Sequence, residues 1–230
     1  MFRFSRAHRR PEGTEGIWAA AAALLDYPTP DLIDSLDQIA ALAPDHPELS
    51  GLITHLRTHD LQSLQAEYVE TFDHTRKCAL YLTYFAYGDT RRRGVAMVSF
   101  KQAYRKAGVV FDEDSEELPD HLCVVLQFGA TVDAEIAWRL LNDHRAGVEM
   151  LRLALAGWRN DDGSVGSPWL GAVSAVCQTL PELRGEEADA VRRLVEQGPP
   201  DEAVGLEPYA IDPLLSEART PQPEFLGMPR

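Results

Sequence analysis

Residues 133–158 read DAEIAWRLLNDHRAGVEMLRLALAGW, and this stretch decides the fold class. Apolar side chains recur in it at alternating spacings of four and three residues, which places them on one face of an α-helix. The residues of this face are Ala137, Leu141, His144, Val148, Leu151 and Leu155. Such spacing is typical of the seam of an antiparallel helix pair. The sequence therefore predicts one long helix from Asp133 to Trp158, with His144 as a core or interface residue.

Most of the chain on either side of this stretch has the same helical character, and runs of alternating apolar and polar residues with hairpin turns are missing. Residues 78–87 are almost wholly apolar or aromatic, which in a helical context predicts a central buried helix. The remaining expected helices cover about 16–26, 30–44, 47–58, 60–72, 91–107, 119–130, 167–179 and 185–197. The predicted fold is a single all-α domain.

Length and composition agree with a single folded domain between two tails. The 230 residues are 45% hydrophobic and 25% charged, close to the average of soluble globular proteins. We expect a basic N-terminal tail at 1–14, the helical domain at 15–198, and a proline-rich, acidic and disordered tail at 199–230. The apolar stretch 17–25 is too short to span a bilayer, and the glutamates and glycines of 11–16 argue against a secretory signal.

Charge and cysteine content exclude several classes of protein. The net charge of −14 disfavours a general nucleic-acid binder. Three widely spaced cysteines, Cys78, Cys123 and Cys177, indicate neither a disulfide framework nor a zinc ribbon, so a reducing cytoplasm is expected. Residues 76–106 nevertheless carry eight basic residues against Asp89 alone. This island either binds an anion, with Arg91, Arg92 and Arg93 as candidates, or is a solvated helix face balanced by the acidic loop at 112–117.

Two short motifs suggest chemistry but are weak signals by themselves. Asp120 and His121 follow Pro119 in the expected first turn of a helix, where capping explains the aspartate as well as any catalytic role does. His55 and His59 stand one helical turn apart without a third metal ligand in sequence, and a polar helix face explains them. An all-helical metal-dependent hydrolase that uses these four residues is kept as the alternative function.

Two blocks of sequence resemble one known family. The first runs from Tyr68-Val69-Glu70-Thr71-Phe72-Asp73 through Arg76 and the apolar stretch at 80–85 to Gly88-Asp89-Thr90-Arg91, with Arg93-Gly94 and Ala96-Met97 beyond it. The second is Glu117-Leu118-Pro119-Asp120-His121-Leu122. Together they are similar to the NarJ-type nitrate reductase molybdenum cofactor assembly chaperones, within the TorD/DmsD/NarJ family of redox enzyme maturation chaperones. The resemblance covers about 67–130.

The resemblance implies an all-helical cytoplasmic chaperone and not an enzyme. Its client would be the apo catalytic (alpha) subunit of a respiratory nitrate reductase, bound through its N-terminal segment before membrane docking. Molybdopterin guanine dinucleotide would be inserted into that client, with no cofactor held stably by the chaperone itself, although cofactor-delivery proteins are conceivable partners. The chaperone would not be part of the finished enzyme.

Carried over by position, the resemblance implies a client-binding region with Tyr68, Phe72, Asp73, Arg76, Pro119, Asp120 and His121. We expect an amphipathic client helix to lie near Tyr68, Phe72 and Tyr87, with Asp73 and Asp120 on an acidic rim. Two positions depart from the family pattern. Cys123 stands where proline is frequent and Gln127 where glutamate is frequent, which weakens recognition by charge at Gln127.

Overall fold

The structure is a computed structural model that describes residues 10–88, 90–112, 115, 117–160, 163–183, 185, 188–189 and 191. These residues form eleven α-helices and no β-strand beyond isolated bridges, so the predicted all-α class is confirmed. The α-helices are α1 (Thr14–Leu24), α2 (Pro30–Asp34), α3 (Leu36–Leu42), α4 (Pro47–Thr58), α5 (Leu61–Tyr68), α6 (Tyr84–Tyr87), α7 (Arg91–Lys106), α8 (Leu122–Thr131), α9 (Ala134–Asp143), α10 (Arg145–Ala156) and α11 (Leu170–Gln178).

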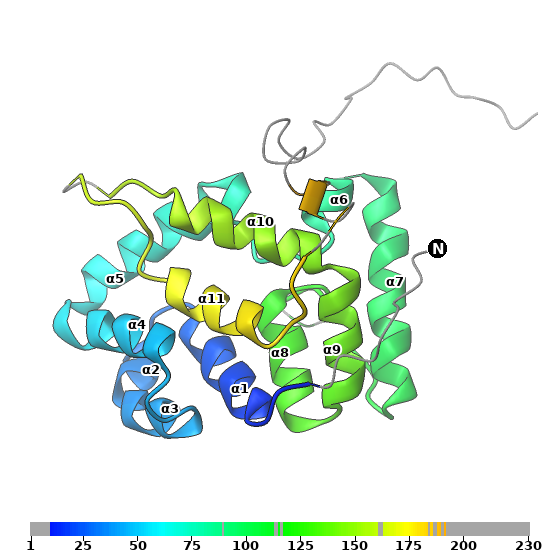
Figure 1. The fold of residues 1–230 in the computed structure, drawn as a ribbon, viewed down its shortest axis with the longest axis horizontal. Coiled ribbons are helices and arrows are strands. Elements are labelled where there is room, and N and C mark those ends of the chain that lie inside the picture. Colours follow the sequence, from blue (N-terminus) through cyan, green and yellow to red (C-terminus); the bar gives the residue numbers. More distant parts are fainter. Residues whose placement is uncertain are drawn as a thin grey trace, which may run out of the picture.

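Helix α1 packs against four other helices. Figure 1 shows it between α2 and α3 on one side and α8 and α9 on the other, with α11 above it, and it contacts α3, α4, α8 and α11. Its Trp18 is fully buried and donates its indole N–H to the Thr179 hydroxyl at 2.9 Å. That bond satisfies a polar group that burial would otherwise leave without water. The N-terminal helix is therefore fixed to the last helix of the described fold.

Close helix packing depends on a glycine in α8. A Cβ atom at Gly129 would overlap with the ring of Trp18 on α1 and with the Cβ of Ala137 on α9. Only glycine lets α8 approach both helices at this point. The three helices are thus held together around one residue without a side chain.

Local rules explain several helix ends, and one predicted helix is confirmed in full. The Thr29 hydroxyl accepts the Leu32 N–H at 3.2 Å, and the Asp60 carboxylate accepts the Ser63 N–H at 3.0 Å, as expected for N-caps. Gly108 follows α7 with φ of +81°, the left-handed conformation expected at a helix end. The helix expected over 47–58 is α4 with the same bounds.

Two predicted helices are each broken in two. The helix expected over 30–44 ends at Asp34 and restarts at Leu36, because Ser35 turns the chain and its hydroxyl donates to the Asp31 carbonyl at 2.7 Å. The long helix expected over 133–158 is interrupted at His144, whose Nδ1 lies 2.9 Å from the Leu140 carbonyl. The break lets α10 turn toward α6, where Gly147 approaches the Leu82 carbonyl. The predicted apolar seam is otherwise buried on both halves.

The prediction of a central helix over 78–87 is wrong. This segment forms a 3₁₀ turn at Arg76–Cys78, an extended stretch and the one-turn helix α6. Cys78, Leu80 and Leu82 are buried while Ala79 and Tyr81 are only partly covered, which is the two-residue period of extended chain. The expectation that most of this apolar run is buried is confirmed, with Tyr87 at 36% exposed as its outer end.

Smaller differences occur at helix ends. The helix expected over 60–72 changes at Val69 into a π-helical turn that ends at Asp73. The helix expected from Pro119 begins only at Leu122, so Asp120 is not in its first turn. The helix expected over 185–197 and both predicted tails lie largely outside the described residues. Within those residues, no helix has the length and apolar character needed to cross a membrane.

Candidate functional site

The loop before α8 pairs with the extended stretch after the 3₁₀ turn. The Leu82 N–H donates to the Asp120 carbonyl at 3.0 Å, and the Leu122 N–H donates to the Leu80 carbonyl at 2.7 Å. Tyr81 and His121 face each other in this short antiparallel bridge. The pairing brings the two blocks of the family resemblance side by side.

The Asp120 side chain closes this junction from inside. It is fully buried, and its carboxylate accepts a hydrogen bond from the Thr83 hydroxyl. The same carboxylate oxygen lies 3.3 Å from the Thr83 backbone nitrogen, which donates to it, and 3.8 Å from the Arg93 guanidinium. Arg93 comes from α7 and lies over the ring of Tyr81 at 4.9 Å. The carboxylate therefore ties the loop, the extended stretch and α7 together, and it does not form the exposed rim that the sequence suggested.

His121 lies beside Asp120 at the edge of the same junction. It is 7% exposed; its ring centroid is 5.2 Å from that of Tyr81, and its Nε2 lies 3.7 Å from the Glu117 carboxylate. Burial lowers the pKa of His121, although the carboxylates of Glu117, Asp120 and Asp26 oppose this. The imidazole is thus neutral at pH 7 and suited to hydrogen bonding.

Tyr68 and Phe72 belong mostly to the core. Each is 8% exposed, and their rings pack against the fully buried Trp169 with centroid distances of 5.7 Å. The Tyr68 hydroxyl donates to the Leu25 carbonyl at 3.1 Å. Tyr27 covers Tyr68 edge-on at 5.4 Å and is 40% exposed. Tyr27 therefore presents to solvent the aromatic surface that the sequence assigned to Tyr68 and Phe72.

Three exposed carboxylates connect the aromatic cluster with the Asp120 junction. We call Asp26, Asp73 and Glu117 the acidic patch. Burial raises the pKa of Tyr68, and all three members of the patch raise it further. Asp26 and Glu117 also act on His121. Asp26 and Glu117 thus act on both Tyr68 and His121, Asp73 acts on Tyr68, and Phe72 packs against Tyr68.

The other predicted residues lie in different settings. The Pro119 ring is buried, and its carbonyl accepts the Tyr104 hydroxyl at 2.6 Å. Arg76 is exposed in the 3₁₀ turn. Arg91 and Arg92 are exposed at the start of α7, whereas the side chain of Arg93 is 12% exposed and faces Asp120. The three arginines therefore do not form one cluster, and their anion-binding role stays a prediction.

The two positions that depart from the family pattern both lie on α8. Cys123 is partly covered, and burial raises the pKa of its thiol, with Asp26 and Glu117 adding to the effect. Gln127 is exposed. Cys123 is therefore close to Asp26 and Glu117, and its raised pKa favours the protonated thiol.

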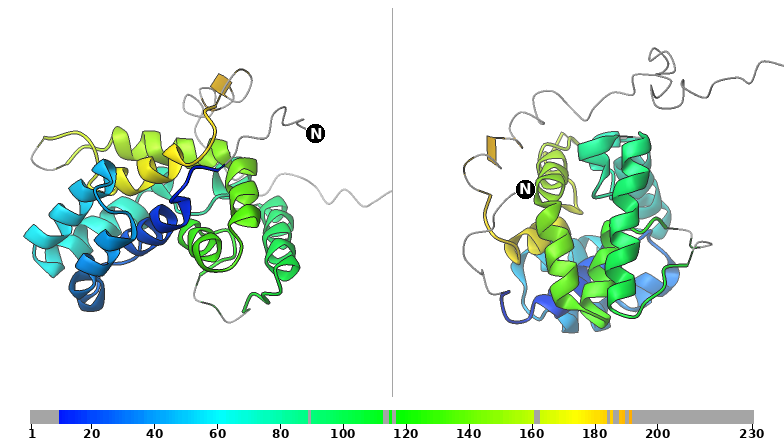
Figure 2. Two further views of the ribbon diagram at one scale, coloured as in Figure 1. Left: turned by 60° about the horizontal axis from the view of Figure 1, so that its bottom comes forward. Right: turned by 90° about the vertical axis from the view of Figure 1, so that its right-hand side faces the viewer.

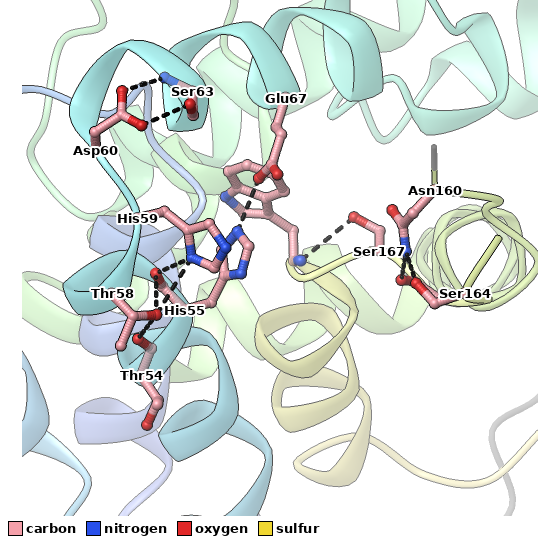
Figure 3. Close-up of polar contacts among 12 residues, drawn as sticks. Thr54, His55, Thr58, His59, Asp60, Ser63, Glu67, Asn160, Ser164 and Ser167 are labelled. Atoms are coloured by element: carbon pink, nitrogen blue, oxygen red, sulfur yellow. Dashed lines mark hydrogen bonds and ion pairs between the residues drawn. The ribbon is translucent and has the colours of Figure 1, made fainter. Parts of the chain in front are cut away.

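The histidine pair contacts a different part of the molecule. The ring of His55 on α4 and that of His59, the C-cap of α4, are tilted against each other with centroids 4.0 Å apart. The His55 Nε2 lies 2.8 Å from the Glu67 carboxylate of α5 (Figure 3). Asp120 and His121 instead contact Thr83, Tyr81 and Glu117, as above. Across the described part of the chain, no three His, Cys, Asp or Glu side chains are placed to hold one metal ion. This arrangement gives no support to the hydrolase alternative.

A cavity of about 760 Å³ lies away from all these residues. Its lining includes the ion-paired side chains Arg145, Glu149 and Arg152 of α10, together with Cys177 of α11. Burial raises the pKa of the Cys177 thiol to about 11. No residue of the predicted client-binding region lines this cavity.

Sequence reasoning missed four residues that shape the site. Asp26 and Tyr27 come just after α1, where the sequence shows an aromatic beside a carboxylate at a helix end but does not indicate that Tyr27 is exposed. Tyr81 and Thr83 were assigned to a buried helix. The extended period of two residues in 78–82 was the signal that could have separated Tyr81 from its buried neighbours.

Comparisons with known proteins agree on one family. Residues 38–160 match the family model described as nitrate reductase delta subunit. The nitrate reductase-like protein NarX of Mycobacterium tuberculosis is 36% identical over 165 residues, 71% of this chain, and the chain spans about a quarter (24%) of that protein. The probable nitrate reductase molybdenum cofactor assembly chaperone NarJ of Bacillus subtilis is 29% identical, with 58% of this chain and 75% of that protein covered.

A solved structure supports the fold. The crystal structure of a putative redox enzyme maturation protein from Archaeoglobus fulgidus aligns with a TM-score of 0.51 and 21% identity, over 84% of this chain and 99% of that one. At this identity the likeness concerns the arrangement of helices. The family model covers more than half of the chain, including the paired 78–82 stretch and the Asp120 loop, and so the chain belongs to the nitrate reductase delta subunit family.

Proposed function

We propose that this chain is a cytoplasmic assembly chaperone of a respiratory nitrate reductase. It binds the N-terminal segment of the apo catalytic subunit and keeps that subunit ready for insertion of molybdopterin guanine dinucleotide. It releases the subunit before membrane docking, so it is not part of the final enzyme and performs no catalysis. The names of the B. subtilis and other family relatives support the assembly role.

The acidic patch is the observation that carries the binding proposal. Its three carboxylates are exposed. Tyr27 packs edge-on against Tyr68, and Tyr81 lies beside His121 and Glu117. A basic amphipathic helix fits this surface, because its apolar face covers the aromatic edges while its lysines or arginines meet the carboxylates. Asp120 contributes by holding the loop that carries Glu117 and His121 against Tyr81.

Calorimetric titration with the first 40 or so residues of the catalytic subunit from the same organism tests this proposal. We expect dissociation constants of micromolar or tighter, about −8 kcal/mol. The triple variant Asp26→Asn, Asp73→Asn, Glu117→Gln should bind about tenfold more weakly, since each exposed charge pair contributes roughly 0.5 kcal/mol.

The matched control is Asp34→Asn, an exposed carboxylate on α2 outside the site, which should leave the affinity unchanged. The difference between the wild-type chain and the triple variant should shrink in high salt. Equal affinity of the wild-type chain and the triple variant at low salt would refute the acidic patch as the binding surface. Absence of any binding would refute the proposed client.

A further inference from the structure

The outward side of α7 is unusual for a soluble bundle. Figure 1 and the right view of Figure 2 show α7 at the outside of the molecule, where it contacts α6 and α9. Of its 16 residues, only Phe100 and Tyr104 are buried. We call the exposed residues Arg91, Arg92, Val95, Val98, Arg105 and Lys106 the basic face of α7.

Two exposed valines lie between the charges of this face. Val95 is 74% exposed and Val98 is 49% exposed, and they are spaced to lie on the same side of the helix as Arg91 and Arg105. The helix carries six basic residues and no acidic one over 91–106. Arg93 among them faces Asp120 and does not belong to the basic face. A surface that combines apolar side chains with several exposed cations suits an acidic, apolar segment.

We propose that residues 201–217 of the same chain dock on the basic face of α7. This segment reads DEAVGLEPYAIDPLLSE and holds five carboxylates and no basic residue. Between the carboxylates stand apolar side chains, among them Leu206, Tyr209 and Ile211. Both the sign of the charge and the apolar content are therefore complementary to the basic face.

The covalent connection is long enough for this docking. The last described residue, Val191, lines the same cavity as Arg145 of α10; α10 contacts α9, and α9 contacts α7. Arg145 is the first residue of α10 and stands two positions after the end of α9, so one helix-to-helix step of about 8–10 Å, from α9 to α7, remains. Ten extended residues from Val191 to Asp201 span about 33 Å, which exceeds that distance.

The chain that leaves α7 does not cover the valines. Phe111 stacks on Tyr104 at 6.0 Å and lies 5.8 Å from the Lys101 ammonium, so the segment after Gly108 returns along that flank of the helix. Val95 and Val98 stay exposed with this segment in place. The basic face is thus open to another segment.

Zero-length carbodiimide cross-linking of the full chain tests the docking, because the whole chain has only three lysines, Lys77, Lys101 and Lys106. Lys77 is exposed on the 3₁₀ turn and serves as an internal control. We expect the yield of cross-links between Lys106 and carboxylates of 201–217 of the same chain to be at least five times the corresponding yield for Lys77. The variant Val95→Ser, Val98→Ser should reduce that yield severalfold, whereas Val165→Ser, a 63% exposed control, should not.

Three results would overturn the proposal. These are equal yields at Lys77 and Lys106, an unchanged yield in the valine variant, and links that form only between chains. A mixture of isotopically labelled and unlabelled chains distinguishes the last case, in which a second copy would supply the segment. None of these outcomes depends on the client, so the test is separate from that of the proposed function.

Discussion

Replacement of Asp120 by alanine tests whether this carboxylate holds the site together. The change leaves the Thr83 N–H and hydroxyl without their acceptor and removes the buried countercharge of Arg93. Unsatisfied buried donors cost about 1–3 kcal/mol each, and loss of one partner of a buried charge pair costs about 3–5 kcal/mol. Because Arg93 keeps some solvent contact, we expect the free energy of unfolding to fall by about 3 kcal/mol.

This loss is large against the 5–15 kcal/mol of a typical domain, and it corresponds to a melting temperature lower by roughly 6–12 °C. Urea unfolding followed by circular dichroism measures it. Asp120→Asn keeps an acceptor for Thr83 and should cost about half as much. A double-mutant cycle with Thr83→Val should show a coupling energy above about 1 kcal/mol. If Asp120→Ala unfolds within 1 kcal/mol of the wild-type chain yet loses client affinity, the carboxylate is a client contact and our reasoning is wrong.

Three further perturbations have defined outcomes. Burial lowers the pKa of His121 and His144 in the folded chain, so the unfolded chain binds their protons more readily. The free energy of unfolding should therefore be highest above pH 6.5 and fall as the pH drops from 6.5 through the folded pKa values, by up to about 1.4 kcal/mol per pH unit for each histidine. Melting curves from pH 7.5 to 5.5 measure this, and a flat profile would contradict it. Gly129→Ala should destabilise the chain by about 1–3 kcal/mol, because the new methyl group overlaps with α1. Gly94→Ala, at an open position of α7, should instead stabilise the chain by about 0.5–1 kcal/mol. Denaturant midpoints that move in the same direction for both variants would refute the packing argument. Tyr27→Ala should weaken peptide binding at least threefold in calorimetry with little change in melting temperature, and a large loss of stability instead would place Tyr27 in the core.

Helix positions follow local rules, so the sequence predicted many of them. Thr29 and Asp60 cap their helices through bonds to residues three positions later, and Gly108 supplies the left-handed turn after α7. The apolar seam around Leu141 and Val148 is buried as predicted. Such features depend on neighbours within one or two turns, which a single sequence displays.

Long-range pairing explains where the predictions failed. Residues 78–82 pair with the loop at 120–122, and no feature of their local sequence indicates this pairing. A short apolar run fits a buried helix equally well when its partner is unknown. The same pairing buries Asp120, which had been expected on the surface. The break at His144 is likewise followed by a long-range contact, the approach of Gly147 to the Leu82 carbonyl, which is far away in sequence.

The candidate site was found by motif and corrected by geometry. Tyr68 and Phe72 are close to the proposed surface, but their rings mainly support it from within, beside Trp169. Tyr27, which no motif indicated, is the exposed aromatic of that cluster. Contact with a client stays a prediction for every residue of the site.

Hydrogen exchange of the full chain with and without the 40-residue client peptide tests the central claim most directly. We predict protection at 26–27, 73–81 and 117–121, the segments that carry the acidic patch and its aromatic edges. Protection confined to residues 145–152 and 177–183, which line the separate cavity, would contradict the account and move the binding site to α10 and α11.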